Sequence, residues 1–340
     1  MKMLSFFLPV FLFCTVEVRG TDQPFVYPGE GVPEDRPVWG LREGIRIGLH
    51  PTRGPAGLIR IYTPYLGQPY PRVVNYLSIE PMVVGETHRE QSELEISRVR
   101  PGKEGLSFWA THSIEDSRPP SMPVRGRIDP ASGRLHVFIH TEPFPNGARP
   151  VVECVFDPAR PHEIELVTHA DPEGKEMAQC ILSATMGNYG QLRRLHLADD
   201  QSIHASTLWK DEDPLDQLGF LPWHTFPPES LTRLPDGRYH VELSTDAVDP
   251  VHVEHDPGVK WWWKYTGQKA IHYWRTEADA APSVAVNARR SYWRSKSRIP
   301  GGASFENFEL NLPFQAGRRL WFGIIPDNES RDPEEQTPNP

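Results

Sequence analysis

Short stretches of alternating apolar and polar residues, separated by turn sequences, recur along this chain. Ile45, Ile47 and Leu49, for example, alternate with polar or small residues. Proline and glycine, 36 and 26 of the 340 residues, form turn sequences such as Pro145-Asn146-Gly147 and disfavour long helices. The pattern predicts an all-β protein, a large antiparallel β-sandwich of two packed multi-stranded sheets with few helices.

A single sandwich domain over 38–326 is the first prediction for domain organisation, because the sequence has no low-complexity linker and no repeat of fixed period. The alternative is two smaller sandwiches joined near 199–222, a polar and turn-rich stretch. We expect a helix in part of 186–197. The proline-rich 21–37 should form an extended N-terminal arm, and the acidic 327–340 a disordered tail.

The first 20 residues read as a secretory signal peptide, with Lys2 as the charged start and a short apolar run before Gly20. The run is too short to span a bilayer, and Pro9 interrupts it. We therefore expect a secreted or periplasmic protein without a membrane span. Cys154 and Cys180 remain after cleavage, and they form either one disulfide or two buried thiols.

Charge and missing motifs exclude several classes of function. The formal net charge of -9 argues against a nucleic-acid partner, which would require a strongly basic domain. The sequence has no Gly-x-Ser-x-Gly elbow, phosphate-binding glycine loop, dinucleotide fingerprint, His-Glu-x-x-His or Cys-x-x-Cys. Serine hydrolases, nucleotide-dependent enzymes and zinc proteases are thereby disfavoured.

Residues 252–296 combine five of the ten tryptophans with tyrosines, lysines and arginines. Indole rings cover the apolar C–H faces of sugars, and guanidinium or ammonium groups bind carboxylates, sulfates and hydroxyls. An earlier cluster around Arg60 and Tyr62 repeats this mixture. The predicted substrate-binding residues are Trp261, Trp262, Trp263, Trp274, Arg289, Trp293, Arg60 and Tyr62.

Two sets of catalytic residues fit a carbohydrate substrate. In a polysaccharide lyase, Arg275 or Arg289 would neutralise a uronate, His272 or His255 would be the base, and Tyr265 the acid. In a glycoside hydrolase, Glu80 would act with Glu93 or Glu95. Glu80 lies among apolar residues, so partial burial should raise its pKa towards that of a general acid.

No metal cofactor is predicted, although calcium bound by carboxylates is an open alternative. The run His252-Val253-Glu254-His255-Asp256 resembles a ligand set, but strand alternation would direct His255 away from His252 and Glu254.

Composition and strand density resemble, in general terms, the large β-sandwich proteins that bacteria secrete to act on polysaccharides. The sequence therefore favours a secreted carbohydrate-active protein whose partner is a polysaccharide or oligosaccharide. The leading hypothesis is a lyase or hydrolase that acts on an acidic glycan. The alternatives are a non-catalytic carbohydrate-binding or cell-surface β-sandwich protein, and a scaffold whose aromatic residues all lie in the core. The sequence leaves the oligomeric state open.

Overall fold

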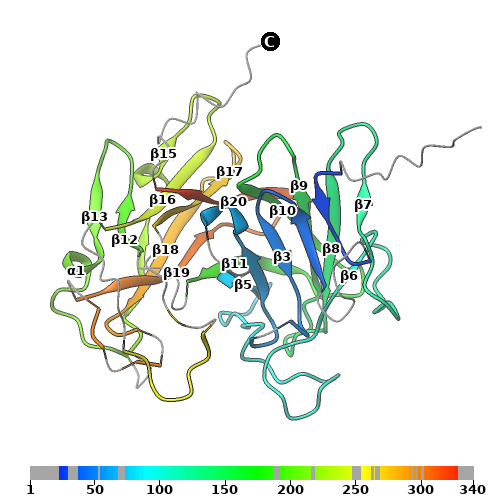
Figure 1. Cartoon of the computed structure of the whole chain (residues 1–340), viewed down its shortest axis with the longest axis horizontal. Helices are drawn as coiled ribbons and strands as arrows, with labels where there is room; N and C mark the ends of the chain where they lie inside the picture. The colour runs from blue at the N-terminus through cyan, green and yellow to red at the C-terminus, as the bar shows by residue number, and fades with distance from the viewer. Residues whose placement is uncertain are drawn as a thin grey trace, which may run out of the picture.

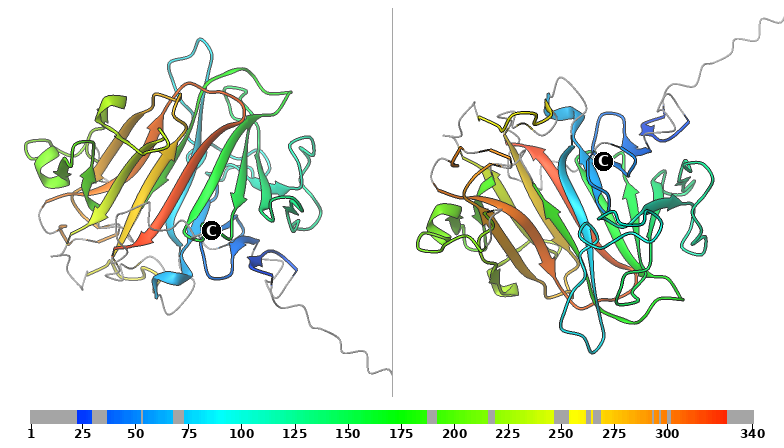
Figure 2. Two further views of the ribbon diagram at one scale, coloured as in Figure 1. Left: turned by 90° about the horizontal axis from the view of Figure 1, so that it is seen from above. Right: turned by 90° about the horizontal axis from the view of Figure 1, so that it is seen from below.

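Two large antiparallel sheets packed face to face form the protein (Figures 1 and 2), as the strand pattern predicts. The computed structural model describes residues 23–29, 37–52, 54–67, 73–186, 192–215, 219–246, 254–261, 264, 269–292, 294–295, 297–299 and 302–327.

The first sheet has nine strands and carries the candidate site. In spatial order its strands are β1 (Phe25–Val26), β2 (Val38–Leu41), β3 (Arg46–Gly48), β4 (Ile59–Tyr62), β5 (Val73–Val83), β11 (Met177–Thr185), β19 (Ser304–Asn311), β18 (Ser283–Arg289) and β14 (His224–Phe226). It faces the viewer in the right-hand view of Figure 2.

The second sheet has eleven strands. Nine follow one another as β13 (Ser202–His204), β12 (Leu192–His196), β16 (Tyr239–Thr245), β17 (Ala270–Thr276), β20 (Arg318–Pro326), β10 (Glu163–Ala170), β9 (Pro150–Phe156), β8 (Leu135–Thr141) and β6 (Phe108–Thr111). The other two, β15 (Thr232–Arg233) and β7 (Arg127–Ile128), pair with β16 and β8. The helical elements are η1 (Pro64–Leu66), α1 (Ala205–Leu208) and η2 (Pro228–Ser230).

Both sheets contain strands from both halves of the chain. In the nine-stranded sheet, β11 lies between β5 and β19. In the eleven-stranded sheet, β20 lies between β10 and β17. The stretch 199–222, considered above as a link between two smaller sandwiches, contributes β13 and α1 beside β12. The two halves therefore share one pair of sheets.

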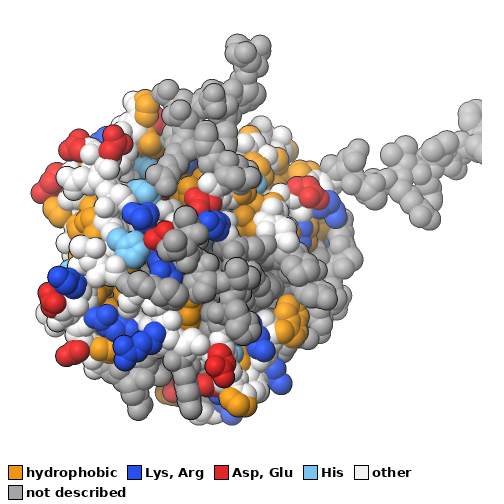
Figure 3. Space-filling model, turned by 60° about the vertical axis from the view of Figure 1, so that its left-hand side comes forward, with side chains coloured by type: hydrophobic (Ala, Val, Ile, Leu, Met, Phe, Trp, Pro, Cys, Tyr) orange, Lys and Arg blue, Asp and Glu red, His pale blue; other side chains and the backbone are white. Residues whose placement is uncertain are grey.

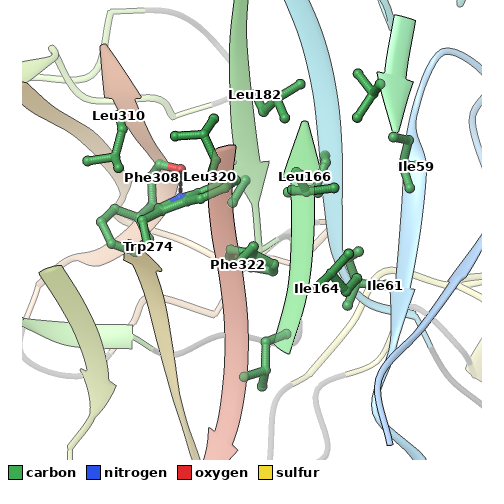
Figure 4. Close-up of a cluster of buried hydrophobic side chains, with 14 of the residues drawn as sticks. Ile59, Ile61, Ile164, Leu166, Leu182, Trp274, Phe308, Leu310, Leu320 and Phe322 are labelled. Carbon is green, nitrogen blue, oxygen red and sulfur yellow. Dashed lines mark hydrogen bonds between the residues drawn. The ribbon is translucent and has the colours of Figure 1, made fainter. Parts of the chain in front are cut away.

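The main core lies between the sheets and follows from period-two alternation along each strand. Ile59 and Ile61 from one sheet and Leu166 and Phe322 from the other lie in the same buried cluster (Figure 4). Each such side chain, when fully buried, contributes about 1.5–3 kcal/mol. Residues of odd number on β5, such as Leu77 and Ile79, face this core, so the even-numbered residues point to the outer face.

The helix expected in part of 186–197 is not formed over Leu192–His196, which is strand β12. The spacing of Leu192 and His196 also fits a period of two, and Leu192 and Leu195 are buried in the core. Pairing with β13 on one side and β16 on the other stabilises this segment as a strand.

Part of the expected N-terminal arm is an edge strand rather than a free extension. Phe25 and Val26 pair with Leu41 and Gly40 of β2, and Phe25 is buried. The segment 1–22, with the expected signal peptide, and residues 328–340 of the expected tail lie outside the described residues.

Cys154 and Cys180 are free thiols. Cys154 lies on β9 and Cys180 on β11, so they belong to different sheets. Burial raises the pKa of both thiols above its usual value. Of the two alternatives left open by the sequence, the structure has the pair of thiols.

Candidate functional site

A hairpin after β5 brings charged side chains back over the outer face of the nine-stranded sheet. The backbone N–H groups of Glu90 and Ser92 donate to Pro81 and Ile79 of β5, at 3.1 and 3.2 Å. The buried Ser92 hydroxyl accepts from the Ile79 N–H and donates to the Gly57 carbonyl, at 2.9 and 2.6 Å. This return segment, residues 90–92, is therefore fixed to the edge of β5 beyond the end of β4.

Glycine is required where the return segment meets the loop before β4. Gly57 has a φ of +73°, in the left-handed region, and a β-carbon there would lie 2.1 Å from the Ser92 carbonyl oxygen. No other residue fits so close to that backbone without displacing it. The position of Glu93, directly after Ser92, thus depends on a residue 36 positions earlier in the chain.

Arg89 joins two buried glutamates from different strands. Its Nε lies 3.0 Å from Glu80 Oε2 on β5, and its Nη1 donates to Glu309 Oε1 on β19 at 2.7 Å. The side chains of Glu80 and Glu309 are 5% and 1% exposed, against 23% for Arg89. We call Glu80, Arg89, Glu93 and Glu309 the acidic site.

Unequal charge in the acidic site raises carboxyl pKa values. Burial, followed by the charge of Glu309, raises the pKa of Glu80 to about 8, although Arg89 and a 2.6 Å hydrogen bond from Ser78 act in the opposite direction. Burial also raises the pKa of Glu93 to about 7. Because one guanidinium cannot neutralise three carboxylates, the site holds protons near neutral pH.

Two carboxylate oxygens of the acidic site, Glu93 Oε2 and Glu309 Oε2, are buried without a hydrogen-bond partner among the residues that the structure describes. Buried acceptors are normally paired, since desolvation without a hydrogen bond is costly. These oxygens can accept from a donor that enters the site, such as a hydroxyl group.

Trp223 borders the acidic site on the side of β14. The Arg89 guanidinium carbon lies 5.3 Å from the centre of the Trp223 ring, and the tryptophan is 38% exposed. Such cation–π contacts contribute about 0.5–1 kcal/mol at exposed positions. The acidic site therefore has an exposed aromatic ring at its rim.

Among the residues predicted from the sequence, the structure brings Glu80 and Glu93 together. Glu95 lies farther along the same hairpin and hydrogen-bonds with Glu90, whose pKa is raised to about 7 by burial and by that contact.

Arg60, Tyr62 and Arg289 belong to the same sheet as the acidic site. Arg60 is fully buried and donates to the carbonyls of Leu58 and Pro55. The ring of Tyr62 packs against Gly48, where a β-carbon would lie 2.9 Å from it. Arg289 is 4% exposed, with Glu306 at 3.7 Å. Arg60 is therefore closed to a ligand, whereas Tyr62 is half-buried.

His272 and Trp274 face the core between the sheets, contrary to the prediction of a site on this strand. Both are 0% exposed, and the Trp274 Nε1–H donates to the Phe308 carbonyl at 3.0 Å (Figure 4). Asn75 Nδ2 lies 3.2 Å from His272 Nδ1, and burial lowers the histidine pKa to about 3. A base with that environment cannot reach a polysaccharide.

Arg275 lies on the other side of β17, on the outer face of the eleven-stranded sheet. It forms an ion pair with Glu163, and Tyr273 donates to the same carboxylate at 3.1 Å. Burial lowers the pKa of Arg275 to about 10. The structure thus separates Arg275 from the acidic site by the full thickness of the sandwich.

The remaining predicted residues lie in or near the loop at 254–261. The backbone of His255 bridges to Ser295, and Trp261 is 43% exposed. Tyr265, Trp262, Trp263 and Trp293 lie outside the described residues. Of the predicted residues of this segment that the structure describes, Trp274 therefore lies in the core, Arg275 on the opposite face and Trp261 at the surface.

Cations of this segment mostly have internal partners. Arg290 donates to the carbonyls of Trp209 and Glu212, and Arg294 lies 3.9 Å from an Asp256 carboxylate oxygen. Acidic and basic side chains lie beside each other at several places on the face shown in Figure 3. The basic residues thus give little support to recognition of an acidic glycan.

Within the described part of the chain, no group of three or more His, Cys, Asp or Glu side chains is arranged to hold a metal ion. His252 and Val253 of the suspected ligand run fall outside that part. The described residues likewise form no helix long and apolar enough to cross a membrane.

Sequence reasoning missed Arg89, Glu309 and Trp223. Glu309 lies within an alternating strand, where it reads as a solvent-facing residue, and Arg89 lies in a polar turn. Arg89 and Glu309 meet because β19 lies two strands away from β5 in the sheet. Trp223 directly follows the apolar residues Phe220, Leu221 and Pro222, so it reads as one more residue of the core.

No protein-family model matches the chain, and no curated protein matches its sequence. The function is therefore argued from the geometry of the site.

Proposed function

We propose that the protein is a carbohydrate-active enzyme and that the acidic site hydrolyses a glycosidic bond. The observation that carries this proposal is the contact of Arg89 with Glu80, Glu309 and an exposed indole ring, with Glu93 near enough for its charge to act on Glu80. Carboxyl pairs next to a sugar-stacking ring are the equipment of glycoside hydrolases.

The surroundings of Glu80 and Glu93 assign them the roles of general acid and general base. Glu80, the more deeply buried, holds its proton up to about pH 8 and would protonate the leaving glycosidic oxygen. Glu93, with a pKa of about 7, would take a proton from the attacking water. Water adds across the bond, so one proton is given to the leaving group and one is removed from the nucleophile. Arg89 positions Glu80 and limits the negative charge.

The placement of His272 and Arg275 favours the hydrolase over the lyase. His272 and Arg275 cannot serve one lyase site, because β17 directs them to opposite sides of its sheet. Of the alternative pair, His255 and Arg289, the arginine is only 4% exposed. The exposed rings of Trp223 and Trp261 would serve a non-catalytic carbohydrate-binding protein equally well. A binding protein needs no titrating group, however. This second candidate function therefore gives the buried carboxyls of the acidic site no role.

The test is incubation of the mature chain with neutral and acidic polysaccharides, followed by measurement of reducing ends and of the ultraviolet absorbance of unsaturated uronates. We expect reducing ends without absorbance. Glu93→Gln should lower the rate by about 10²–10⁴-fold, whereas Glu104→Gln, an exposed position on the same hairpin, should not. Absorbance would indicate a lyase, and retention of glycan without cleavage would indicate a binding protein.

A further inference from the structure

The backbone on both sides of Trp223 is anchored, although its ring is exposed. The residues on both sides are anchored: the Trp209 Nε1–H donates to the Pro222 carbonyl at 2.8 Å, and His224 Nε2 lies 2.9 Å from Glu212 Oε1. The Leu221 N–H also donates to Ala288 of β18 at 2.8 Å. A fixed backbone presents the indole at 38% exposure beside Arg89.

An exposed indole on an anchored backbone, next to buried acceptors, matches the two sides of a pyranose. The ring face can cover the C–H surface of a sugar, since indole carries both a large apolar area and a polarised π-system. Sugar hydroxyls can donate to Glu93 Oε2 and Glu309 Oε2, the buried oxygens without a hydrogen-bond partner in the described structure. Little backbone entropy is lost on binding to a ring whose backbone is already anchored.

The charges of the acidic site favour a neutral sugar. Three carboxylates surround the site, and Arg89 already contacts two of them. A uronate or sulfate would have to compete with Glu80 and Glu309 for Arg89, because both glutamates already contact this cation. The acidic glycan expected from the basic residues of 252–296 does not fit this arrangement.

We propose that Trp223 is the sugar-stacking residue of the acidic site and that its ligand is a neutral, hydroxyl-rich glycan. This inference rests on the proposed function, because it assigns the substrate class of the same site. It names a residue outside the aromatic segment that dominates the sequence.

The test is isothermal titration of the Glu80→Gln mature chain, which should bind without cleavage. The probes are neutral hexasaccharides of gluco, manno, xylo and galacto configuration, and an oligogalacturonate. We expect at least one neutral hexasaccharide to bind more tightly than the oligogalacturonate. Adding Trp223→Ala should weaken that binding by about tenfold, whereas Trp223→Phe should retain most of it.

Leu215→Ala is the matched control, since this exposed residue lies in the same segment and should bind like the parent. Tighter binding of the oligogalacturonate would overturn the neutral substrate class. Undiminished binding by Trp223→Ala, or a loss in Trp261→Ala instead, would overturn the stacking role of Trp223. If no saccharide binds, the proposed function fails and this inference fails with it.

Discussion

The outer faces of the two sheets both carry carboxylates that are largely shielded from solvent, but the groups around these carboxylates differ. On the eleven-stranded sheet, Glu153 accepts from His136 and His169 at 2.7 and 3.0 Å. On the nine-stranded sheet, Glu80 shares Arg89 with Glu309.

Burial raises the pKa of both Glu153 and Glu80, and the neighbours decide the outcome. Hydrogen bonds from the two histidines lower the pKa of Glu153 to about 2, whereas the charge of Glu309 helps to raise that of Glu80 to about 8. Deeper burial and a neighbouring carboxylate distinguish Glu80 from Glu153, whose two histidine donors outweigh its partial burial.

The largest expected effect is the difference in hydrolytic activity between variants on the two outer faces of the sandwich. Glu80→Gln should lower the hydrolytic rate by about 10²–10⁴-fold, because the general acid is lost. Glu163→Gln, on the opposite face, should leave the rate per folded molecule unchanged. Initial rates normalised to the folded fraction measure both. Equal losses in the two variants would break the comparison.

The same pair of variants should show the reverse order in stability. Glu163 is 4% exposed in its side chain and pairs with Arg275, so Glu163→Gln leaves a buried cation without its counter-charge. We expect a loss of about 3–5 kcal/mol in the free energy of unfolding, measured in urea. Glu173→Gln, whose side chain is 75% exposed, is the control and should cost less than about 1 kcal/mol.

The dependence of stability on pH should have opposite signs on the two faces. The pKa of Glu80 in the folded protein lies above the ordinary value of 4.5. Its contribution to stability is therefore complete below pH 4.5 and is lost as the pH rises through about 8. The contribution of Glu153 to stability is present above pH 4.5 and is lost as the pH falls towards about 2. Urea unfolding at several pH values should therefore show Glu80→Gln gaining stability over the native chain between pH 5 and 8. A constant difference would contradict the assignment.

Activity should follow the same two carboxyls. With Glu93 ionised above about pH 7 and Glu80 protonated below about pH 8, kcat/KM should pass through a maximum between these values. Because the two groups interact, the two limbs belong to the pair. An activity that rises steadily beyond pH 9 would exclude Glu80 as the acid.

The smallest expected effect concerns the hydrogen bond from Ser78 to Glu80. Ser78 donates to Glu80 Oε1 and lowers its pKa, so Ser78→Ala should shift the alkaline limb of the activity profile to higher pH. The cost in stability should be about 1 kcal/mol. An unchanged limb would show that Glu80 does not set it.

Period-two patterns were sufficient to predict the sandwich, because each strand with one buried face records that burial in its sequence. Of the site, Glu80 could be predicted because a glutamate among apolar residues must be partly buried. Arg89 and Glu309 could not, since sheet order, which the sequence does not state locally, places β19 near β5.

Sheet geometry also separates two residues of the tryptophan-rich segment that the sequence placed in one site. Clustering in sequence predicted a common site, but alternation on β17 directs Trp274 into the core and Arg275 to the opposite surface. A large ring fits a sheet interface as well as it fits a sugar.

Strand β20 also determines when the fold can be completed during synthesis. It is the last strand along the chain, yet it lies in the middle of the eleven-stranded sheet, with four strands on each side along the main path. Until residues 318–326 leave the ribosome, the two groups of strands have no common partner. The two groups of strands can therefore join only after residues 318–326 have been made, so truncation before 318 should leave both groups with an unpaired edge in the middle of the sheet.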